Sequence, residues 1–413
     1  MEPIALLQDK RIALGVCGGI AAYKVADLAS KLAQAGARVD CVLTESAVRF
    51  VTPLTFASVT GRRAFTDADL WDTATHVPHV GLGTQADLVV IAPATANTLA
   101  KLAQGLADNL LTVTALAARC PVLVVPAMDA GMWEHPATQA NIATLRERGV
   151  ITVGPERGRM ASGFVGLGRM AEPGDILGHI RLALGRNGPL AGRRIVVTAG
   201  GTQEPLDPVR YVGNRSSGKQ GFALAQAALD RGASVTLIAG ATANLPTPIG
   251  ATRVDVMTAT QMQDAVTEVC HDADALLMAA AVADFRPAQV AEQKIKKSSD
   301  ATELALRLER TPDILAAVHA ARNQVPRLQV VVGFAAETQD LLANAQKKLA
   351  AKGLDLIAAN DVSASDAGFA VDTNRVTILD RGGRAEALPL MSKAAVAQAL
   401  IERVANRLTG GSR

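Results

Sequence analysis

Residues 11–35, RIALGVCGGIAAYKVADLASKLAQA, decide the fold class. A short apolar run opens this stretch, Gly18-Gly19 interrupts it, and apolar residues from Ile20 to Ala35 recur at helical spacing. Gly36 ends the predicted helix, and a second apolar run follows at 38–43. This order predicts a strand, a glycine turn, a helix and a parallel strand.

Further apolar runs at 86–92 and 121–125 fit a parallel sheet that helices cover on both faces. The same order of signals begins again at Arg194. We therefore predict an α/β protein with two doubly wound, Rossmann-like domains of mainly parallel sheets. Turn-forming residues at 185–192 set the predicted domains at 1–186 and 187–413.

Composition excludes several classes of function. The net charge is only +3, and the aromatic residues are 8 Phe, 2 Trp and 2 Tyr, which disfavours a base-stacking groove or a basic nucleic-acid surface. The four cysteines are far apart and contain no CxxC pair, so neither a disulfide framework nor a zinc site is expected. Without a leader pattern or a long apolar run, we expect a soluble cytoplasmic protein.

Ligands of open α/β sheets bind beyond the carboxyl ends of the strands. In the first half, Gly18-Gly19 leads into a helix, where backbone N–H groups favour a phosphate, although an ordinary strand-to-helix turn explains this pair about as well. The stretches 44–47 and 93–98 add small and hydroxyl side chains at the same edge. Three such loops favour a mononucleotide such as FMN.

Four motifs of the first half resemble the flavin-dependent cysteine decarboxylases, specifically the phosphopantothenoylcysteine decarboxylases, which are flavodoxin-like. They are Gly18-Gly-Ile-Ala-Ala-Tyr-Lys24, Ala92-Pro-Ala-Thr-Ala96, Ala107-Asp-Asn-Leu-Leu111 and Pro126-Ala-Met-Asp-Ala-Gly-Met-Trp133. The resemblance implies FMN and a catalytic histidine, at His79 or alternatively His76. It implies substrate contacts at Asp129 and Met132. The implied FMN-binding residues are Gly18, Gly19, Ile20, Thr44, Ser46, Pro93, Thr95 and Asn97.

Two residues depart from the pattern of this family. Asp129 stands where the family usually has Asn, and an ionised Asp facing the substrate carboxylate costs binding. Ser162 stands where the family usually has a catalytic Cys, and a hydroxyl is a far weaker acid than a thiol. We expect either a subfamily with a compensated pair of changes or an impaired decarboxylase half.

The second half places several phosphate-binding signals at its own sheet edge. Residues 198–221 are rich in Gly, Ser and Asn and open a helix. Asp284 follows a buried strand, where it could hold Mg²⁺, and a lysine cluster follows at 294–297, although a solvated edge strand is ordinarily the better explanation of such a cluster. With a predicted loop at 333–338, followed by Lys348 and Lys352, this set suits triphosphate binding and pyrophosphate release.

These stretches resemble the phosphopantothenate–cysteine ligases over about residues 190–405. The motifs are Asn214-Arg-Ser-Ser-Gly-Lys219, Ala283-Asp-Phe-Arg-Pro287, Lys294-Ile-Lys-Lys297, Gly333-Phe-Ala-Ala-Glu-Thr338 and Asp355-Leu-Ile-Ala-Ala-Asn-Asp361. The resemblance implies CTP, an acyl-cytidylate intermediate, catalytic roles for Asn214 and Lys294, and a substrate contact at Arg210. The implied CTP-binding residues are Gly200, Ser217, Ala281, Asp284, Lys294, Phe334, Lys348 and Lys352, with Asp284 also at the metal.

The whole chain thus resembles the bifunctional enzymes of coenzyme A biosynthesis that make 4′-phosphopantetheine from 4′-phosphopantothenate, cysteine and CTP with FMN and Mg²⁺. The partners expected are these small molecules, and the resemblance implies a homo-oligomer with a dimeric ligase half and a trimer-based flavin half. One alternative is a ligase whose first half only binds flavin and oligomerises. A flavoprotein regulator is disfavoured by the ligase motifs, and an NAD-dependent dehydrogenase by the absence of GxGxxG.

Overall fold

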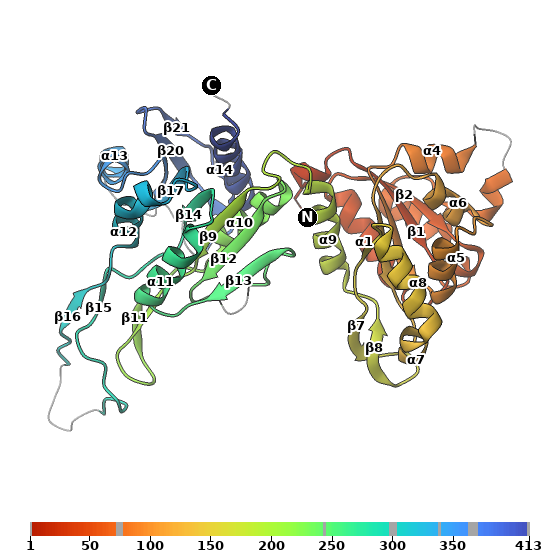
Figure 1. The fold of residues 1–413 in the computed structure, drawn as a ribbon, viewed down its shortest axis with the longest axis horizontal. Helices are drawn as coiled ribbons and strands as arrows, with labels where there is room; N and C mark the ends of the chain where they lie inside the picture. The colour runs from red at the N-terminus through yellow and green to blue at the C-terminus, as the bar shows by residue number, and fades with distance from the viewer. Residues whose placement is uncertain are drawn as a thin grey trace. The chain divides into compact units, whose positions relative to one another are not determined.

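The computed structural model describes residues 2–71, 77–242, 245–296, 304–337, 340–361 and 371–410. The chain divides into two compact units, Met1–Leu184 and Gly185–Arg413, each an α/β structure (Figure 1). Among the described residues, no helix has the length and apolar character needed to cross a membrane. His76, Lys297 and Thr338, named above, lie outside the described residues.

Unit 1 contains a six-stranded parallel sheet of order β3-β2-β1-β4-β5-β6. The chain order reverses between β1 and β4, which makes that position the topological switch point where ligands bind in such sheets. The strands are β1 (Arg11–Val16), β2 (Arg38–Leu43), β3 (Phe65–Thr66), β4 (Leu88–Ala94), β5 (Val122–Pro126) and β6 (Ile151–Thr152). An antiparallel hairpin of β7 (Glu156–Arg159) and β8 (Val165–Arg169) follows them.

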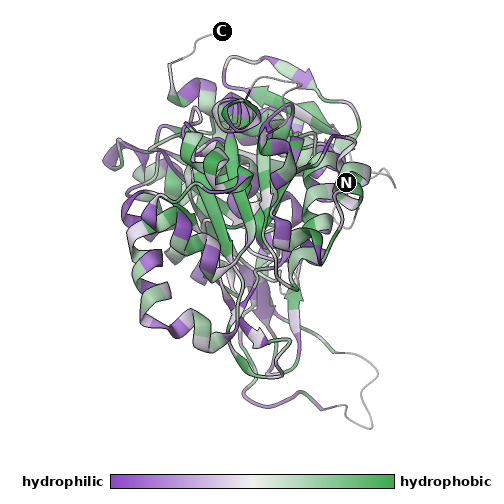
Figure 2. Cartoon of the chain, turned by 90° about the vertical axis from the view of Figure 1, so that its right-hand side faces the viewer, coloured by the Kyte–Doolittle hydropathy of each residue, from purple (hydrophilic) through white to green (hydrophobic). Residues whose placement is uncertain are grey.

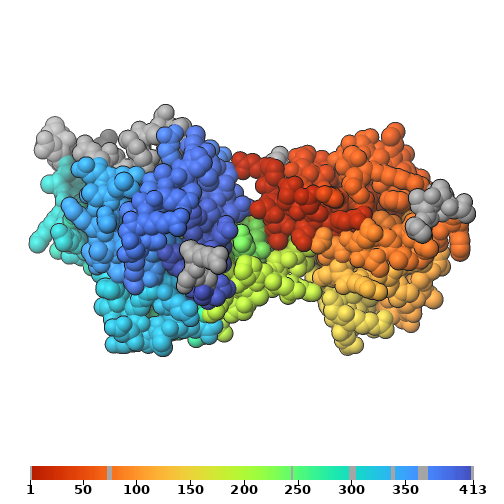
Figure 3. All heavy atoms as spheres, turned by 90° about the horizontal axis from the view of Figure 1, so that it is seen from above, coloured from red at the N-terminus to blue at the C-terminus, as the bar shows by residue number. Residues whose placement is uncertain are grey.

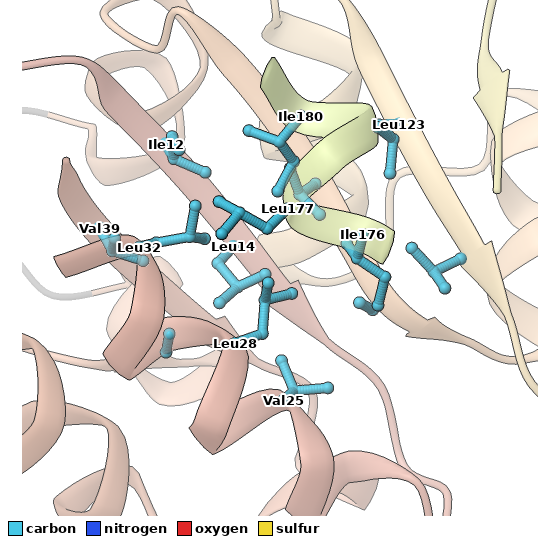
Figure 4. Close-up of a cluster of buried hydrophobic side chains, with 14 of the residues drawn as sticks. Ile12, Leu14, Val25, Leu28, Leu32, Val39, Leu123, Ile176, Leu177 and Ile180 are labelled. Atoms are coloured by element: carbon cyan, nitrogen blue, oxygen red, sulfur yellow. The ribbon is translucent and has the colours of Figure 1, made fainter. Parts of the chain in front are cut away.

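Helices cover both faces of this sheet. They are α1 (Ala22–Gln34), α2 (Glu45–Val48), α3 (Pro53–Thr60), α4 (Pro78–Thr84), α5 (Ala96–Gln104), α6 (Leu110–Ala117), α7 (Ala130–Glu134), α8 (Pro136–Glu147) and α9 (Pro173–Gly185). On one face, Leu28 of α1 and Ile176 of α9 pack around Leu14 of β1 (Figure 4). On the other face, Leu99 of α5 and Leu145 of α8 join a second core.

Two covered faces explain why the strands are apolar along their whole length instead of alternating. All seven residues of β4 are buried, and the strands are the most apolar part of the cartoon in Figure 2. Each fully buried Leu or Ile contributes about 1.5–3 kcal/mol relative to an exposed one. The predicted α/β class with mainly parallel sheets is confirmed.

Unit 2 contains an eight-stranded sheet of order β13-β12-β9-β14-β17-β18-β20-β21. The sheet is parallel as far as β18, and β20 and β21 extend it antiparallel. The strands are β9 (Arg194–Ala199), β12 (Ser234–Ala239), β13 (Ala251–Asp255), β14 (Ala275–Met278), β17 (Val330–Glu337), β18 (Leu356–Asp361), β20 (Val376–Asp380) and β21 (Ala385–Ala387). Here the chain order reverses between β9 and β14.

Three two-stranded ladders accompany this sheet. They are β10 (Gln203–Pro205) with β11 (Tyr211–Gly213), β15 (Phe285–Pro287) with β16 (Leu308–Arg310), and β19 (Thr373–Asn374) with β22 (Met391–Ser392). The loop predicted at 333–338 is wrong, because β17 continues through these residues to Glu337 and pairs there with Asp361 of β18.

The helices of unit 2 lie on two sides of the sheet. They are α10 (Lys219–Asp230), α11 (Ala259–Cys270), α12 (Ile314–Ala321), α13 (Leu341–Ala351) and α14 (Lys393–Leu408). Residues of α11, α12 and α13 share one buried cluster with the strands. Helices α10 and α14 pack against each other, with the strands between this pair and α11–α13 (Figure 1). Figure 3 shows α14, in dark blue, against the lighter blue of residues that precede it in unit 2.

Candidate functional sites

The glycine turn of unit 1 (Gly18-Gly19) lies between the loops that follow β2 and β4. A Cβ atom placed on Gly18 would lie 2.4 Å from Cβ of Ser46, whereas one on Gly19 would meet only Cγ2 of Thr95, at 3.9 Å. The turn therefore packs tightly on the first loop and leaves open space beside Gly19. The structure thus brings together the three stretches that the sequence placed at this edge, but 44–47 and 93–98 are not loops, because residues 45–48 form α2, β4 extends to Ala94 and α5 begins at Ala96.

Short helices begin at both flanking loops, each with a threonine cap. Thr44 Oγ1 accepts a hydrogen bond from Ala47 N (3.3 Å), and Thr95 Oγ1 accepts one from Thr98 N (3.4 Å). Cys17 Sγ donates to Thr98 Oγ1 (3.2 Å), and burial raises the pKa of Cys17 to about 11, so that it stays a thiol. These bonds fix the loops that surround the glycine turn.

One residue that sequence reasoning missed joins two helix starts at this edge. The Asp67 carboxylate accepts hydrogen bonds from Glu45 N (2.9 Å) and from Leu110 N (3.1 Å). It thereby satisfies backbone donors at the start of α2 and of α6. The sequence feature that could have revealed Asp67 is its position directly after the short strand β3.

Most residues predicted to bind FMN surround the glycine turn. Thr44 and Pro93 are buried, whereas Ile20, Ser46 and Asn97 are exposed around it. Backbone atoms of the glycine turn form the base of this candidate site, and small polar side chains lie around it. It suits a ligand that carries a phosphate, because backbone N–H groups at such a turn bind anions.

The two residues that depart from the decarboxylase pattern bond to each other. Ser162, in the β7–β8 hairpin, donates from Oγ to Asp129 Oδ2 (2.6 Å), while Asp129 Oδ1 accepts from Gly131 N (3.1 Å). The hydrogen bond from Ser162, followed by that from Gly131, lowers the pKa of the Asp129 carboxyl. Asp129 is therefore a carboxylate at neutral pH. Met132, the other predicted substrate contact, is half exposed on α7.

His79 lies away from this pair. It is on α4, which packs against α6 and the short helix η2 (Asp67–Trp71). Figure 1 places α4 and the β7–β8 hairpin at opposite ends of unit 1. Within the described part of the chain, the buried Nδ1 of His79 has no hydrogen-bond partner. One copy of unit 1 therefore does not bring His79 together with Asp129 and Ser162.

Unit 2 contains a cavity of about 750 Å³ at its topological switch point. Its lining comes from the residues after β11 and β14, from the starts of α10, α12 and α14, and from β17, β18 and α13. Seven predicted residues line it: Asn214, Ser217, Ala281, Asp284, Phe334, Lys348 and Lys352. The structure thus gathers most of the predicted nucleotide site in one cavity.

Asn214 has a defined structural partner in the loop after β14. Its Nδ2 donates to the carbonyl oxygens of Ala281 (3.3 Å) and Val282 (3.1 Å). Gly200, by contrast, is not among the lining residues. It lies beneath Gly218, because a Cβ atom added to Gly218 would be 3.3 Å from Gly200 N. Gly200 therefore supports the start of α10.

One carboxylate of the cavity escaped sequence reasoning. Asp313 caps α12 by accepting from Ala316 N (3.0 Å), and it forms an ion pair with Lys352. Burial alone would raise the pKa of Asp313, but the bonds from Lys352 and Ala316 and the charges of Lys352 and Lys348 lower it. The missed signal was an aspartate just before an apolar helical run. Lys348 Nζ donates to the Phe334 carbonyl oxygen (3.0 Å).

Arg210 and Lys294 lie outside the cavity lining. Arg210 donates to Asp207 Oδ2 (2.7 Å) and to the carbonyl oxygen of Ile295 (2.6 Å). Burial alone would raise the pKa of Asp207, but hydrogen bonds from Val209, Ile295 and Arg210 hold it well below its usual range. This network anchors the segment that carries Lys294, whose side chain is exposed.

Asp284 is exposed at the cavity, and the described residues contain no group of three or more His, Cys, Asp or Glu side chains arranged to hold a metal ion. A single carboxylate fits Mg²⁺ nonetheless, because this ion is usually bound by one or two carboxylates together with substrate phosphates. The residues present therefore suit a metal that arrives with a nucleotide.

Two family models together match most of the chain. Residues 3–184 match the family model described as "Flavoprotein", and residues 190–408 match "DNA/pantothenate metabolism flavoprotein C-terminal domain". The coenzyme A biosynthesis bifunctional protein of Mycobacterium bovis is 48% identical, with 98% of each chain covered. That of Bacillus subtilis is 45% identical, over 97% of this chain and 98% of the relative.

A solved structure of the FMN-dependent cysteine decarboxylase SpaF is 36% identical, covers 44% of this chain and 97% of its own, and has a TM-score of 0.39. The full-length relatives settle the family. The chain belongs to the coenzyme A biosynthesis bifunctional proteins. The predicted enzyme with a flavoprotein decarboxylase half and a ligase half is confirmed.

Proposed function

We propose that unit 2 joins cysteine to 4′-phosphopantothenate with CTP and Mg²⁺, and that unit 1 decarboxylates the product with FMN. The observation that supports this most is the cavity at the switch point of unit 2. It combines the lysines Lys348 and Lys352, the carboxylate of Asp284 and the amide of Asn214. Lysines and a metal-binding carboxylate are the groups that stabilise phosphoryl transfer.

The ligase reaction has two steps. A carboxylate oxygen of 4′-phosphopantothenate attacks the α-phosphorus of CTP, pyrophosphate leaves, and an acyl-cytidylate forms. The amine of cysteine then attacks the acyl carbon, CMP leaves and the amine loses a proton. Lys348 and Lys352 would offset the charge of the phosphates, and Asp284 would hold the Mg²⁺ that accompanies them.

Asn214 fixes the backbone after β14 through its bonds to the carbonyl oxygens of Ala281 and Val282. Its proposed role is to hold the acyl-cytidylate against this backbone. Lys294 is proposed to contact the developing charge, and because its segment lies outside the cavity lining of its own chain, that role requires either movement of the segment or a second copy of unit 2. Arg210 acts on the same segment through Ile295.

In unit 1, the glycine turn and its two flanking loops are proposed to hold FMN. The open space beside Gly19 fits this group, because a Cβ atom added to Gly19 would meet, besides the neighbouring residues of the chain, no described atom closer than 3.9 Å. When bound, FMN supplies two-electron redox chemistry. The proposed contacts are those predicted at Gly18, Gly19, Ile20, Thr44, Ser46, Pro93, Thr95 and Asn97.

Asp129 and Ser162 are proposed to act as one unit. Ser162 Oγ donates to the Asp129 carboxylate, so the two side chains hold each other in one orientation. The 2.6 Å bond is the observation that favours a compensated pair of changes. The second candidate function is a ligase whose first half binds flavin without decarboxylating, and the ionised Asp129 favours it because it repels a substrate carboxylate.

We further propose a homo-oligomer with a dimeric ligase half and a trimer-based flavin half. The separation of α4 from the β7–β8 hairpin supports an oligomeric flavin half, whereas the numbers of subunits come from the family resemblance alone. If His79 and Ser162 act on one substrate, they come from two copies of unit 1. Sedimentation of the full chain measures the number of subunits. The activity of a mixture of the His79→Asn and Ser162→Ala variants tests whether sites are shared, because mixed oligomers recover activity only when the two residues of a site come from different copies.

Two variants test the assignments separately. Asn214→Asp should abolish formation of phosphopantothenoylcysteine while flavin content stays normal, and normal turnover would contradict the ligase site. His79→Asn should retain FMN and stop release of carbon dioxide. Single-turnover reduction of the flavin by phosphopantothenoylcysteine separates the two candidate functions, because a flavin half that does not decarboxylate leaves the flavin oxidised.

A further inference from the structure

A second, smaller cavity of unit 2, with a volume of about 300 Å³, lies beside the β15–β16 ladder. Phe285 and Arg310, which are opposite each other in this ladder, line the larger cavity, whereas the next pair, Arg286 and Glu309, lines the smaller one. Successive residues of a strand point to opposite faces, so the ladder separates the two cavities. A ligand in the smaller cavity would therefore occupy a site distinct from the proposed nucleotide site.

Glu204 is a buried carboxylate that lines this smaller cavity, with only 2% of its surface exposed. Its Oε1 accepts a hydrogen bond from Ala259 N (2.8 Å), at the start of α11. In the described part of the chain, no group bonds to Oε2 and no cationic side chain pairs with Glu204. Carboxylates are rarely buried to this degree without a charged partner, so a cationic group bound in the cavity would offset the cost of burying this one.

Arg286 provides a positive charge beside the same helix start. Its Nη1 donates to Thr260 Oγ1 (3.2 Å) and its Nε to Glu309 Oε1 (2.9 Å), whereas no described group accepts from Nη2. Glu204 is bonded to Ala259 and Arg286 to Thr260, and the Cα atoms of consecutive residues are about 3.8 Å apart. The carboxylate and the guanidinium therefore lie near each other at the cavity, although these two described side chains form no ion pair.

We infer that this cavity binds a free α-amino acid with a small side chain. The ammonium group of the ligand would pair with Oε2 of Glu204, and its carboxylate with the planar guanidinium of Arg286. Pro205, Pro287 and Val290 add apolar surface for the side chain of the ligand. The volume is at the lower end of the range for ligand sites, which suits a ligand of this size. A metal ion is disfavoured, because the described residues contain no group of three or more side chains arranged to hold one.

Calorimetric titration of the full chain with L-alanine, without CTP and 4′-phosphopantothenate, tests this inference independently of any ligase turnover. L-Alanine should bind. N-acetyl-L-alanine, which lacks the ammonium group, and L-alaninamide, which lacks the carboxylate, should each bind at least about tenfold more weakly, the effect of one lost charge-assisted hydrogen bond. Absence of L-alanine binding, or equal binding of the three compounds, would overturn the inference.

Two variants test whether L-alanine binds in this cavity. Glu204→Gln keeps an oxygen that can accept from Ala259 N but removes the charge, and Arg286→Met removes the guanidinium, so each should weaken binding at least about tenfold. Glu268→Gln is the matched control, because Glu268 is exposed on α11 and does not line the cavity. It should bind L-alanine as the wild type does.

Arg286→Met decides the test alone should Glu204→Gln fail to fold, because Arg286 is only partly buried. Wild-type affinity for L-alanine in Arg286→Met, or in a folded Glu204→Gln, would overturn the inference. That result is the one expected if L-alanine bound in the larger cavity instead.

Discussion

Substituting the two glycines of the turn in unit 1 should have opposite consequences. In Gly18→Ala the new methyl group would lie 2.4 Å from Cβ, 2.7 Å from C and 2.9 Å from O of Ser46. Because two of these atoms are backbone, the contact is relieved only if the loop after β2 moves. Overpacking of this kind costs about 1–3 kcal/mol.

For a unit of this size, that cost corresponds to a fall in the melting temperature of about 2–12 °C. If the displaced loop also contacts FMN, the same energy weakens flavin binding by about 5- to 150-fold. In Gly19→Ala the methyl group meets only Thr95 Cγ2, at 3.9 Å. The apoprotein should then be as stable as the wild type, so any loss of FMN affinity comes from contact with the flavin itself.

The assay pairs calorimetry of the two apoproteins with titration of FMN followed by its fluorescence. The expected pattern is an unstable Gly18→Ala, and a stable Gly19→Ala that binds FMN more weakly than the wild type. Normal FMN affinity in both variants would refute the placement of the flavin at this turn. Equal destabilisation in both would refute the packing argument.

Four further outcomes are expected. Ser162→Ala removes the hydrogen bond to Asp129, so the pKa of Asp129 should rise, and an unshifted NMR titration of that carboxyl contradicts the pairing. Lys352→Met leaves Asp313 without its ion pair and should raise the KM for CTP about tenfold, whereas an unchanged KM removes Lys352 from the nucleotide site. Chelation of Mg²⁺ by EDTA should stop pyrophosphate release and leave the flavin content unchanged, and continued release argues against the metal. Asp274→Asn should destabilise unit 2 by about 1.5–3 kcal/mol, because the buried carboxylate accepts hydrogen bonds from Arg194 N (2.7 Å) and Arg193 (3.1 Å). Burial alone would raise the pKa of Asp274, but these bonds, with one from Arg327, outweigh it and lower that pKa. The contribution of Asp274 to the free energy of unfolding is therefore present above the ordinary carboxyl pKa and disappears as the pH falls through the lower pKa of the folded state. Thermal melts from pH 6 to pH 2 should therefore converge for wild type and variant, and a constant difference contradicts this linkage.

Local patterns in the sequence predict the framework because apolar runs and glycine stops are read over neighbouring residues. The strands β1, β2, β4 and β5 coincide with apolar runs, and the topology of parallel sheets brings the loops after them to one edge. The prediction that the stretches 44–47 and 93–98 surround the glycine turn depended on this rule alone. The loop at 333–338 was wrong because pairing with β18, which no local pattern reveals, extends β17.

The residues that escaped prediction depend on partners far away in the chain. Asp67 binds backbone donors 22 and 43 residues away, and Gln220 reaches Lys393 across 173 residues. The bond between Asp129 and Ser162 spans 33 residues, and it turns two separate departures from a family pattern into one interacting pair. Such contacts arise from tertiary packing, so a single sequence contains no periodic signal for them.

The most direct test incubates the full chain with 4′-phosphopantothenate, cysteine, CTP and Mg²⁺ and identifies the products by mass spectrometry. Accumulation of 4′-phosphopantetheine with release of pyrophosphate and carbon dioxide is the predicted result, and it shows that Ser162 paired with Asp129 supports decarboxylation. Accumulation of phosphopantothenoylcysteine alone would contradict the decarboxylase assignment and leave a ligase with a flavin-binding first half.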